Sequence, residues 1–470
     1  MPRRLEHLTS EDEAILRLES GPVVGHTLKV VLAERPRVRG DLLTALRRRV
    51  AAGVAREPRC TERLAHVPFE LAPPAWVADT EFDVRRHVRG SPLTGIGREG
   101  LLAAAARSME ERLERDRPLW TIDLLEGVDR ERVAYLVKVH HCMADGIASL
   151  RLAGQLLWDR EVERAGLDSD GSGTPELVDK RPGAGRLLVS ALRERVSGVH
   201  DTLVGAGKAL LSRDALRADE AELERLPGTL RRELHATSAR SPFDTAIGRR
   251  RTVGLVSWSL EEVRRVGHAH GATVNDVLLA AVGGGLRRWL AGRGQLLPDV
   301  RVKVPVSMHR DGEGPAALGN RDSFFCIDLP LHAANPGERL EAVRRETVER
   351  KRDHDAEVLY AFFNDLAHVS KRWYRRANAV ASRPGVFSLC VSNLPGPQEQ
   401  LDVLGGAIEE MYSLAEIGDR HGLRISVSSY HGRLSVGLCA DALAVADIGA
   451  LERSLEEELA ELTRAASGPG

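Results

Sequence analysis

A polar stretch near the middle of the chain most strongly limits how these 470 residues can fold. Residues 166–185, GLDSDGSGTPELVDKRPGAG, are rich in Gly, Ser, Asp and Pro and show no apolar period, which is typical of a linker. A charged segment with helical spacing follows over residues 186–234, and strand-like runs resume near residue 251. The sequence therefore predicts three parts: an N-terminal lobe (1–165), a linker with a helical crossover (166–249) and a C-terminal lobe (250–470).

Each predicted lobe mixes strands and helices. In the N-terminal lobe, LKVVLAE (28–34) and VAYLVKVHH (133–141) have the apolar, β-branched composition of strands. DLLTALRRRVAAG (41–53) and GLLAAAARSMEERLERD (100–116) have the spacing of amphipathic helices. The C-terminal lobe combines two helical patterns, 260–269 and 274–290, with the strand-like runs VRVKVPVSM, FFCIDLPL, VFSLCVSNLP, LRISVSSYHG and RLSVGLCAD. Because strands and helices do not alternate strictly, an α/β layer fold with mixed sheets is predicted rather than a doubly wound one.

Charge and composition exclude several classes of protein. The 67 basic and 68 acidic residues nearly cancel, so no overall field attracts nucleic acid. The longest apolar stretch, 277–286, is about half the length that a transmembrane helix needs, and the N-terminus lacks a signal-peptide core. The five cysteines are scattered without C-x-x-C spacing, which suits a reducing compartment and no structural zinc. We therefore expect a cytoplasmic protein with at most peripheral contact with the inner membrane or lipid inclusions.

The most informative short motif is HHCMADG, residues 140–146, at the end of a predicted strand. Adjacent histidines suggest a metal site, a proton shuttle, or two unrelated side chains. Successive side chains on a strand point to opposite faces, so His140 and His141 cannot both reach one metal ion unless the strand breaks between them. We therefore predict no metal site. One histidine would face a cleft, where a neutral imidazole can take a proton from a hydroxyl or thiol.

The residues after the histidines predict a turn into a helix. Asp145 is a good N-cap residue, and Gly146 permits a tight approach. An apolar stripe at helical spacing follows: Ile147, Leu150, Ala153 and Leu157. Asp145 would orient the histidine ring or hold the turn by pairing with an arginine. The simpler alternative is a strand-end histidine with satisfied hydrogen bonds beside an ordinary helix cap.

HHCMADG matches the HHxxxDG signature of CoA-dependent acyltransferases of the chloramphenicol-acetyltransferase-like superfamily, which also contains the peptide-synthetase condensation domains. More narrowly, the chain resembles the bacterial wax ester synthase/acyl-CoA:diacylglycerol acyltransferase (WS/DGAT) family. The resemblance runs from about Glu19 to about Leu462. In chain order, the other matching segments are RDRPLWTIDLLEG, TVNDVLLAAVGGGLRRWL, VPVSMHR, LGNRDSFFCIDLP, SNLPGP and SSYHGRLSVGLCAD.

The resemblance implies a fold and a reaction. Two acetyltransferase-like lobes would be joined by a crossover, with an active-site tunnel between them. The family esterifies an alcohol, either diacylglycerol or a long-chain alcohol, to give triacylglycerol or wax ester. Acyl-CoA is the co-substrate, and no permanently bound cofactor, metal ion or covalent acyl-enzyme is involved. The implied partners are therefore acyl-CoA and a hydroxyl acceptor.

The resemblance also assigns roles to individual residues. His141 would be the general base, Asp145 would hold the loop, and Gly146 would leave room for the thioester. Strand alternation would turn His140 into the lobe, where a hydrogen bond fixes the strand end. The substrate-binding residues expected from the C-terminal lobe are Asn275, Asp276, Ser392 and Asn393. Without the resemblance, the first two read as a helix-capping pair and the last two as an ordinary turn after a strand.

Three features of the sequence leave the identity of the acyl acceptor undecided. The N-terminal segment and residues 398–423 depart from the family pattern, and both are expected to shape the acceptor channel. The basic cluster KRWYRR (371–376) could hold CoA phosphates, lie on a lipid surface, or form a solvated helix face. A tailoring acyltransferase with another acceptor, and a non-catalytic lipid-binding protein of the same fold, are the alternative hypotheses.

Overall fold

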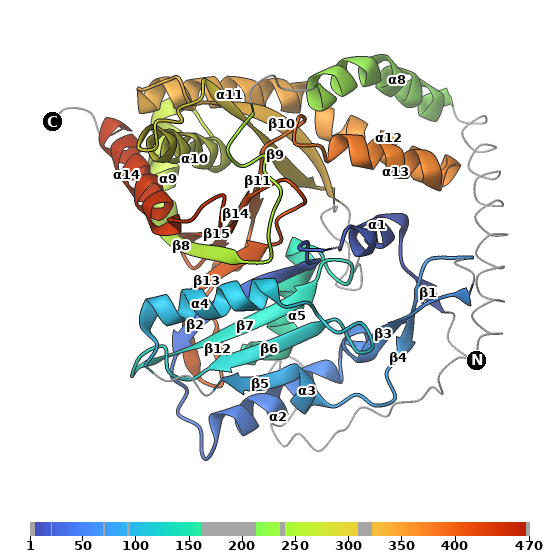
Figure 1. Cartoon of the computed structure of the whole chain (residues 1–470), viewed down its shortest axis with the longest axis vertical. Coiled ribbons are helices and arrows are strands. Elements are labelled where there is room, and N and C mark those ends of the chain that lie inside the picture. The colour runs from blue at the N-terminus through green and yellow to red at the C-terminus, as the bar shows by residue number, and fades with distance from the viewer. Residues whose placement is uncertain are drawn as a thin grey trace.

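The computed structural model of the protein describes residues 5–19, 21–68, 71–91, 95–160, 213–235, 240–308 and 322–466. The predicted linker and the helical stretch up to residue 212 lie outside these ranges, whereas α8 (Arg213–Leu234) forms the last part of the predicted crossover helix. A six-stranded sheet lies at the centre of each half of the molecule, one above the other in Figure 1. Helices cover both sheets, as the predicted α/β layer fold requires.

The first sheet is built around two long, buried, antiparallel strands, β2 and β7. Its order is β12-β13-β2-β7-β6-β5, and it is mixed because β5 and β6 run parallel. The strands are β2 (His26–Glu34), β5 (Val88–Ser91), β6 (Trp120–Leu125), β7 (Arg132–His140), β12 (Asp402–Val403) and β13 (Gly406–Ala415). Alternate β2 residues pack into different clusters. Val31 packs with helices α2 (Leu42–Val54) and α5 (Gly146–Leu157), and Val30 packs with helix α4 (Gly97–Glu110). Both faces of β2 are therefore covered, which explains its unbroken apolar run.

The second sheet has the order β10-β9-β11-β14-β15-β8 and is also mixed. Its strand β11 runs parallel to β9 and β14, and the other pairs are antiparallel. The strands are β8 (Arg251–Ser259), β9 (Asp299–Ser307), β10 (Asp322–Pro330), β11 (Leu389–Leu394), β14 (Leu423–Tyr430) and β15 (Arg433–Asp441). Each strand-like run that the sequence predicts for the C-terminal lobe overlaps one of these six strands.

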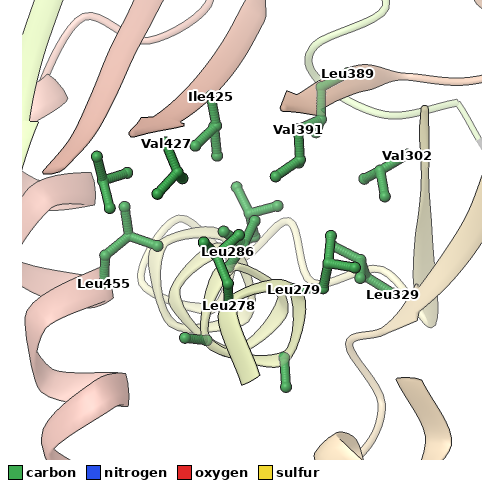
Figure 2. Packing of buried hydrophobic residues seen from close by; sticks show 14 of the residues in the cluster. Leu278, Leu279, Leu286, Val302, Leu329, Leu389, Val391, Ile425, Val427 and Leu455 are labelled. Atoms are coloured by element: carbon green, nitrogen blue, oxygen red, sulfur yellow. The ribbon is translucent and has the colours of Figure 1, made fainter. Parts of the chain in front are cut away.

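Helix α10 (Val274–Ala291) forms the centre of the larger core. Figure 2 shows its Leu278, Leu279 and Leu286 directed toward apolar side chains of the second sheet and of α14. A glycine run in α10 lets α14 (Ile448–Ala466) approach closely, because a Cβ on Gly285 would lie 2.5 Å from Leu455. The helix is therefore buried over most of its circumference, as its apolar sequence indicates.

One strand of the C-terminal half belongs to the first sheet. Strand β13 pairs with β2 from Ile408↔Ala33 to Ala415↔Thr27, and the chain then returns to the second sheet as β14. The predicted partition at residue 250 differs from the structure here, because residues 402–415 complete the sheet of the N-terminal half. The two glutamates in GAIEEMYSLA obscure the strand pattern in the sequence. The exchanged strand ties the two halves together.

The remaining elements surround the sheets. A small sheet has the order β1-β4-β3, formed by β1 (Glu6–His7), β3 (Glu62–Ala65) and β4 (Ala75–Ala78). The other helices are α1 (Ser10–Leu18), α2 (Leu42–Val54), η1 (Pro58–Thr61), α3 (Val84–His87), α4 (Gly97–Glu110), α5 (Gly146–Leu157), α9 (Leu260–His270), α11 (Pro336–Arg352), α12 (Asp355–Val369) and α13 (Lys371–Ala381). None of the helices in the described ranges is both long and apolar enough to cross a bilayer.

Helix α4 ends earlier than its sequence predicts. The amphipathic pattern extends to residue 116, but the helix stops at Glu110. The buried ammonium group of Lys138 donates to the backbone carbonyls of Ser108 (2.9 Å) and Glu111 (3.0 Å). The need to satisfy a buried cation with these carbonyls accounts for the early end.

Candidate active site

The paired histidines lie where β7 ends and the chain turns toward α5. His140 is the last residue of β7 and pairs with His26 of β2. The next amide, that of His141, donates to the carbonyl of Gly25 (2.7 Å). His140 is 1% exposed, whereas His141 lines a cavity. The two rings therefore lie on different sides of the strand end, in agreement with strand alternation.

The ring of His140 is enclosed in the N-terminal half. Its Nδ1 accepts a hydrogen bond from the amide of Cys142 (3.1 Å), and its Nε2 lies 3.5 Å from a carboxylate oxygen of Glu19. Burial alone would raise the pKa of Glu19, but contacts with His140 and Arg115 outweigh burial and lower it to about 2. A Cβ on Gly25 would lie 2.6 Å from the ring, so only glycine fits beside it. These contacts give His140 a structural environment.

The ring of His141 faces a second glutamate, Glu416, which directly follows β13. Nδ1 of His141 lies 2.9 Å from Oε1 of Glu416. Burial opposes charge on both groups, but each charge stabilises the other, so the pKa of His141 is raised and that of Glu416 is lowered to about 2. The guanidinium of Arg424 on β14 also lies near this carboxylate, at 3.6 Å. The pair is therefore formed by an imidazole that can hold a proton and a carboxylate that stays ionised.

The cavity has a volume of about 1000 Å³ and is lined by residues of both halves of the molecule. Its wall includes α1, the start of β2 and the start of α5 from the N-terminal half. From the C-terminal half, α10, β9, β10, β11 and β14 contribute. The structure brings five of the eight predicted site residues together in this wall: His141, Gly146, Asn275, Ser392 and Asn393.

Three predicted site residues lie outside the cavity wall and have structural contacts. His140 is one of them. Asp145 is the N-cap of α5 and accepts a hydrogen bond from the amide of Ala148 (2.7 Å), as the sequence predicts. Asp276, which was expected to line the site, instead forms a capping box with Thr273 and accepts from the hydroxyl of Thr347 (2.6 Å). The carboxylate of Asp276 therefore caps the start of α10, which agrees with the alternative interpretation of Asn275 and Asp276 as a helix-capping pair.

Gly146 has a role in packing between the two halves. A Cβ at this position would lie 2.8 Å from Cδ2 of Leu394, at the end of β11. The expectation was that this glycine leaves room for a thioester. The close neighbour is the side chain of Leu394, so the absence of a Cβ lets the start of α5 approach the C-terminal half.

Sequence reasoning missed the charged residues of the wall. Lys29 donates to the hydroxyl of Ser413 (2.8 Å), and burial lowers its pKa to about 8. Burial also lowers the pKa of Lys303, whose ammonium lies 4.0 Å from the ring centre of Phe324. Burial and the neighbouring Asp322 raise the pKa of Glu11 to about 8. Within the described ranges, no group of three or more His, Cys, Asp or Glu side chains is placed to hold a metal ion.

Glu416 was missed because its strand was missed. It lies in the segment 398–423, whose unusual charge was the one available signal in the sequence. A glutamate that ends a strand is not distinctive by itself. Only the pairing of β13 with β2 places it beside a histidine 275 residues earlier in the chain.

Comparison with known proteins identifies related sequences and folds. The family model described as the wax ester synthase/diacylglycerol acyltransferase catalytic domain matches residues 8–278, and that of the WS/DGAT C-terminal domain matches residues 318–463. A Mycobacterium tuberculosis protein named "Probable diacyglycerol O-acyltransferase tgs1" is 30% identical over 410 residues, which cover 86% of this chain and 84% of the relative.

Solved structures share the two-lobe fold. The wax ester synthase/diacylglycerol acyltransferase from Marinobacter aquaeolei VT8 has a TM-score of 0.66 at 23% identity, covering 98% of this chain and 100% of that chain. The first condensation domain of the calcium-dependent antibiotic synthetase has a TM-score of 0.61 at 17% identity, covering 99% and 97%. These matches confirm the predicted α/β fold with two lobes and mixed sheets.

Proposed function

Because the chain belongs to the wax ester synthase/diacylglycerol acyltransferase family, we propose that it transfers a fatty acyl group from acyl-CoA to the hydroxyl group of diacylglycerol or a long-chain alcohol. The products are triacylglycerol or wax ester and free CoA. The observation that carries the proposal is the position of His141 in the wall of a cavity that both halves of the molecule line. Two substrates can therefore meet at one basic group, in a tunnel between the lobes.

His141 is the general base of the proposed reaction. Its Nδ1 faces Glu416, so Nε2 is the nitrogen that takes the proton from the acceptor hydroxyl. The acceptor oxygen attacks the thioester carbonyl, a C–O bond forms and the C–S bond breaks. CoA leaves as a thiolate and takes the proton from the imidazolium. The acyl group passes directly to the acceptor, without a covalent acyl-enzyme.

Polar side chains of the C-terminal half complete the proposed site. Asn275 lies at the start of α10, and Ser392 and Asn393 lie near the end of β11. Preorganised hydrogen-bond donors that stabilise the charge developing on the carbonyl oxygen lower the activation barrier of acyl transfer considerably. These three residues are the candidates for that role, so both lobes contribute to the reaction.

The charged residues of the wall favour a second candidate acceptor. Lys29, Lys303 and Arg424 are all in the cavity lining, and Glu11 faces the same space. A polar hydroxyl compound can use such groups, whereas the alkyl chain of a fatty alcohol cannot. An acyltransferase that modifies a polar acceptor is therefore the second hypothesis.

The test is the release of CoA from palmitoyl-CoA with hexadecanol, diolein or small polar alcohols as acceptor. We expect release that depends on an acceptor and that His141→Ala lowers by about 10²- to 10⁴-fold. Dependence on hexadecanol or diolein supports the storage-lipid reaction, and dependence on a polar alcohol alone supports the second hypothesis. A folded protein that binds palmitoyl-CoA but releases no CoA with any acceptor would leave the non-catalytic lipid-binding hypothesis.

We also propose that the protein attaches peripherally to a lipid surface, such as the inner membrane or a lipid inclusion, through α13. The side chain of Trp373 is 58% exposed, with the guanidinium of Arg376 over its ring at 5.2 Å. Arg375 reaches Glu13 of α1 at 3.7 Å, and α1 carries Leu18, which is 56% exposed and lines the cavity. Apolar and cationic side chains beside the cavity suit a surface from which lipid substrates enter.

Flotation with anionic phosphatidylglycerol vesicles tests this attachment. We expect Trp373→Ala to weaken binding, while Leu443→Ala, a control at a residue that is 87% exposed, leaves binding unchanged. Higher salt should reduce binding by screening the arginines. Vesicle binding of Trp373→Ala equal to that of the wild type would contradict the proposal. If Arg375→Ala and Arg376→Ala instead left vesicle binding unchanged and raised only the KM for acyl-CoA, the basic cluster KRWYRR (371–376) would bind CoA.

A further inference from the structure

The contact between His141 and Glu416 is created by three neighbouring strands. In the register of the first sheet, Ala415 of β13 lies opposite Thr27 of β2, and Thr27 lies opposite Val139 of β7. Glu416 directly follows β13, and His141 directly follows β7. The strand ends therefore bring the two side chains together from opposite sides of β2, across 275 residues of sequence.

Arg424 holds the carboxylate from the other sheet. Its Nη1 donates to the backbone carbonyl of Glu416 (3.2 Å) and lies 3.6 Å from Oε1 of the same residue. The carboxylate thus lies between an imidazole from the first sheet and a guanidinium from the second. Glu416 and His141 are each only 14% exposed in their side chains, so solvent screens the contact weakly.

The ionisation of the pair follows from these neighbours. Burial would raise the pKa of Glu416, but His141 and Arg424 lower it to about 2, so it is a carboxylate at neutral pH. An ionised carboxylate only accepts hydrogen bonds, and the proton of the contact must therefore reside on Nδ1 of His141. The other charged groups that act on the imidazole are Arg424, which disfavours its protonation, and Asp322, which favours it. Lys29 also acts on Glu416.

We propose that Glu416 is a positioning residue for the acyl transfer, which accepts the Nδ1 proton of His141 and so fixes the ring with Nε2 directed at the acceptor hydroxyl. This inference rests on the proposed function. When Nε2 takes the hydroxyl proton, the ring becomes an imidazolium, and the carboxylate stabilises that charge until the CoA thiolate takes the proton. Arg424 keeps the carboxylate in place but lies farther from it than the imidazole does.

The test compares Glu416→Gln with Glu416→Asp and with Glu409→Gln. Glu409 lies on the same strand, β13, but is exposed, so its substitution is a matched control. Glutamine can donate to Nδ1 and would favour the other tautomer, in which Nε2 carries the proton and cannot act as a base. We expect Glu416→Gln to lower kcat on the order of 100-fold. Glu416→Asp should recover part of the rate, and Glu409→Gln should match the wild type.

The pH profile separates positioning from a purely structural role. Because Glu416 raises the pKa of His141, the wild type should lose kcat/KM as the pH falls through a value above the ordinary 6.5 of histidine. In Glu416→Gln this loss should move to lower pH, because the imidazole no longer has an anionic partner. A structural role alone would lower the melting temperature and leave the acid side of the profile where it was.

A substrate-free measurement keeps this inference distinct from the proposed function. Proton NMR of protein labelled with ¹⁵N-histidine should show a downfield Nδ1–H signal that disappears in both His141→Ala and Glu416→Gln. If the wild type turned over no acyl-CoA while this signal was present, the proposed function would fail and the paired geometry would stand. A folded Glu416→Gln protein with wild-type kcat, pH profile and Nδ1–H signal would overturn the inference.

Discussion

The two histidines of the motif are neighbours in sequence, and each faces a glutamate, yet only the ring of His141 lines the cavity. His140 and the side chain of Glu19 are enclosed in the N-terminal half, where they are 1% and 2% exposed, although Glu19 also contributes to the cavity lining. His141 and Glu416 lie in the cavity wall, between the two sheets. The carboxylate of Glu19 has Arg115 as its closest cation, with His140 at 3.5 Å. Among the described residues, the basic side chain nearest the carboxylate of Glu416 is that of His141, at 2.9 Å.

The difference shows how one strand end can give two identical side chains different roles. Alternation directs the rings to opposite sides, and the surrounding charges then decide what each ring can do. An arginine largely neutralises the carboxylate beside His140, so that pair stabilises the fold. The carboxylate beside His141 instead raises the pKa of the ring, and in the proposed reaction the cavity gives that ring access to a substrate.

The largest expected effect is a loss of turnover when His141 is replaced, which distinguishes it from His140. His141→Ala should lower kcat by about 10²- to 10⁴-fold, because it removes the proposed general base. Its melting temperature and its affinity for acyl-CoA should change little, since thioester binding does not need the imidazole. The measurements are CoA release, acyl-CoA binding and thermal unfolding, with His332→Ala as the control at an exposed histidine. Normal turnover of His141→Ala would remove HHCMADG from the catalytic centre.

Much of this site could be predicted from local sequence. Strand alternation, the cap at Asp145 and the helix that follows depend on residues near one another in the chain, and the structure contains all three. The long strands and helices were also predictable, because their apolar periods are strong. Helix α4 was predicted too long. Its end is set by hydrogen bonds from the buried ammonium group of Lys138, on a distant strand, to carbonyls at the end of the helix.

Features that depend on pairing between segments far apart in the sequence could not be predicted. Strand β13 leaves its own half to pair with β2, and no local pattern in the chain specifies that exchange. Glu416, the partner of His141, could not be predicted for the same reason. Asn275 and Asp276 illustrate the limit further: they are adjacent, but only Asn275 lines the cavity, because the capping box turns Asp276 toward Thr273 and Thr347.

The next largest expected effect is a loss of stability when Glu19, the carboxylate partner of His140, is replaced. Glu19→Gln should lower the free energy of unfolding by about 3 kcal/mol at neutral pH, as expected for a pKa lowered from 4.5 to about 2. A lowered folded-state pKa stabilises the protein above the unfolded value. The difference from the wild type should therefore persist down to about pH 5 and shrink as the pH falls from 4.5 toward 2.

Urea unfolding over this pH range measures the effect of Glu19→Gln, with the exposed Glu99→Gln as its control. Turnover per folded molecule should be close to that of the wild type, since Glu19 acts on His140 rather than on His141. A difference in stability that did not change with pH would show that the carboxylate charge contributes nothing. A large loss of kcat in folded Glu19→Gln would place this glutamate with the catalytic pair instead.

A smaller loss of stability is expected when the imidazole of the enclosed pair is removed. His140→Ala should cost about 2 kcal/mol, because it leaves a cavity and deprives the buried amide of Cys142 of its acceptor. Turnover should fall only as far as folded protein becomes scarcer. Thermal unfolding and CoA release per folded molecule measure the two effects. A well-folded but inactive His140→Ala, together with an active His141→Ala, would reverse the assignment of the two rings.

The smallest expected effect concerns Asp145, which holds the turn that begins at His141. Asp145→Ala should cost about 1 kcal/mol, because the amide of Ala148 loses its cap, and Asp145→Asn should keep most of that stability. A looser turn misplaces the base, so kcat should also fall in the alanine variant, by about tenfold or less. Asp41→Ala is the matched control, because it removes a side-chain cap at the start of α2, outside the cavity wall, and should lower stability without lowering kcat. If Asp145→Ala kept both its melting temperature and its rate, the turn would be fixed by other contacts, and the difference between the two histidines would rest on their glutamates alone.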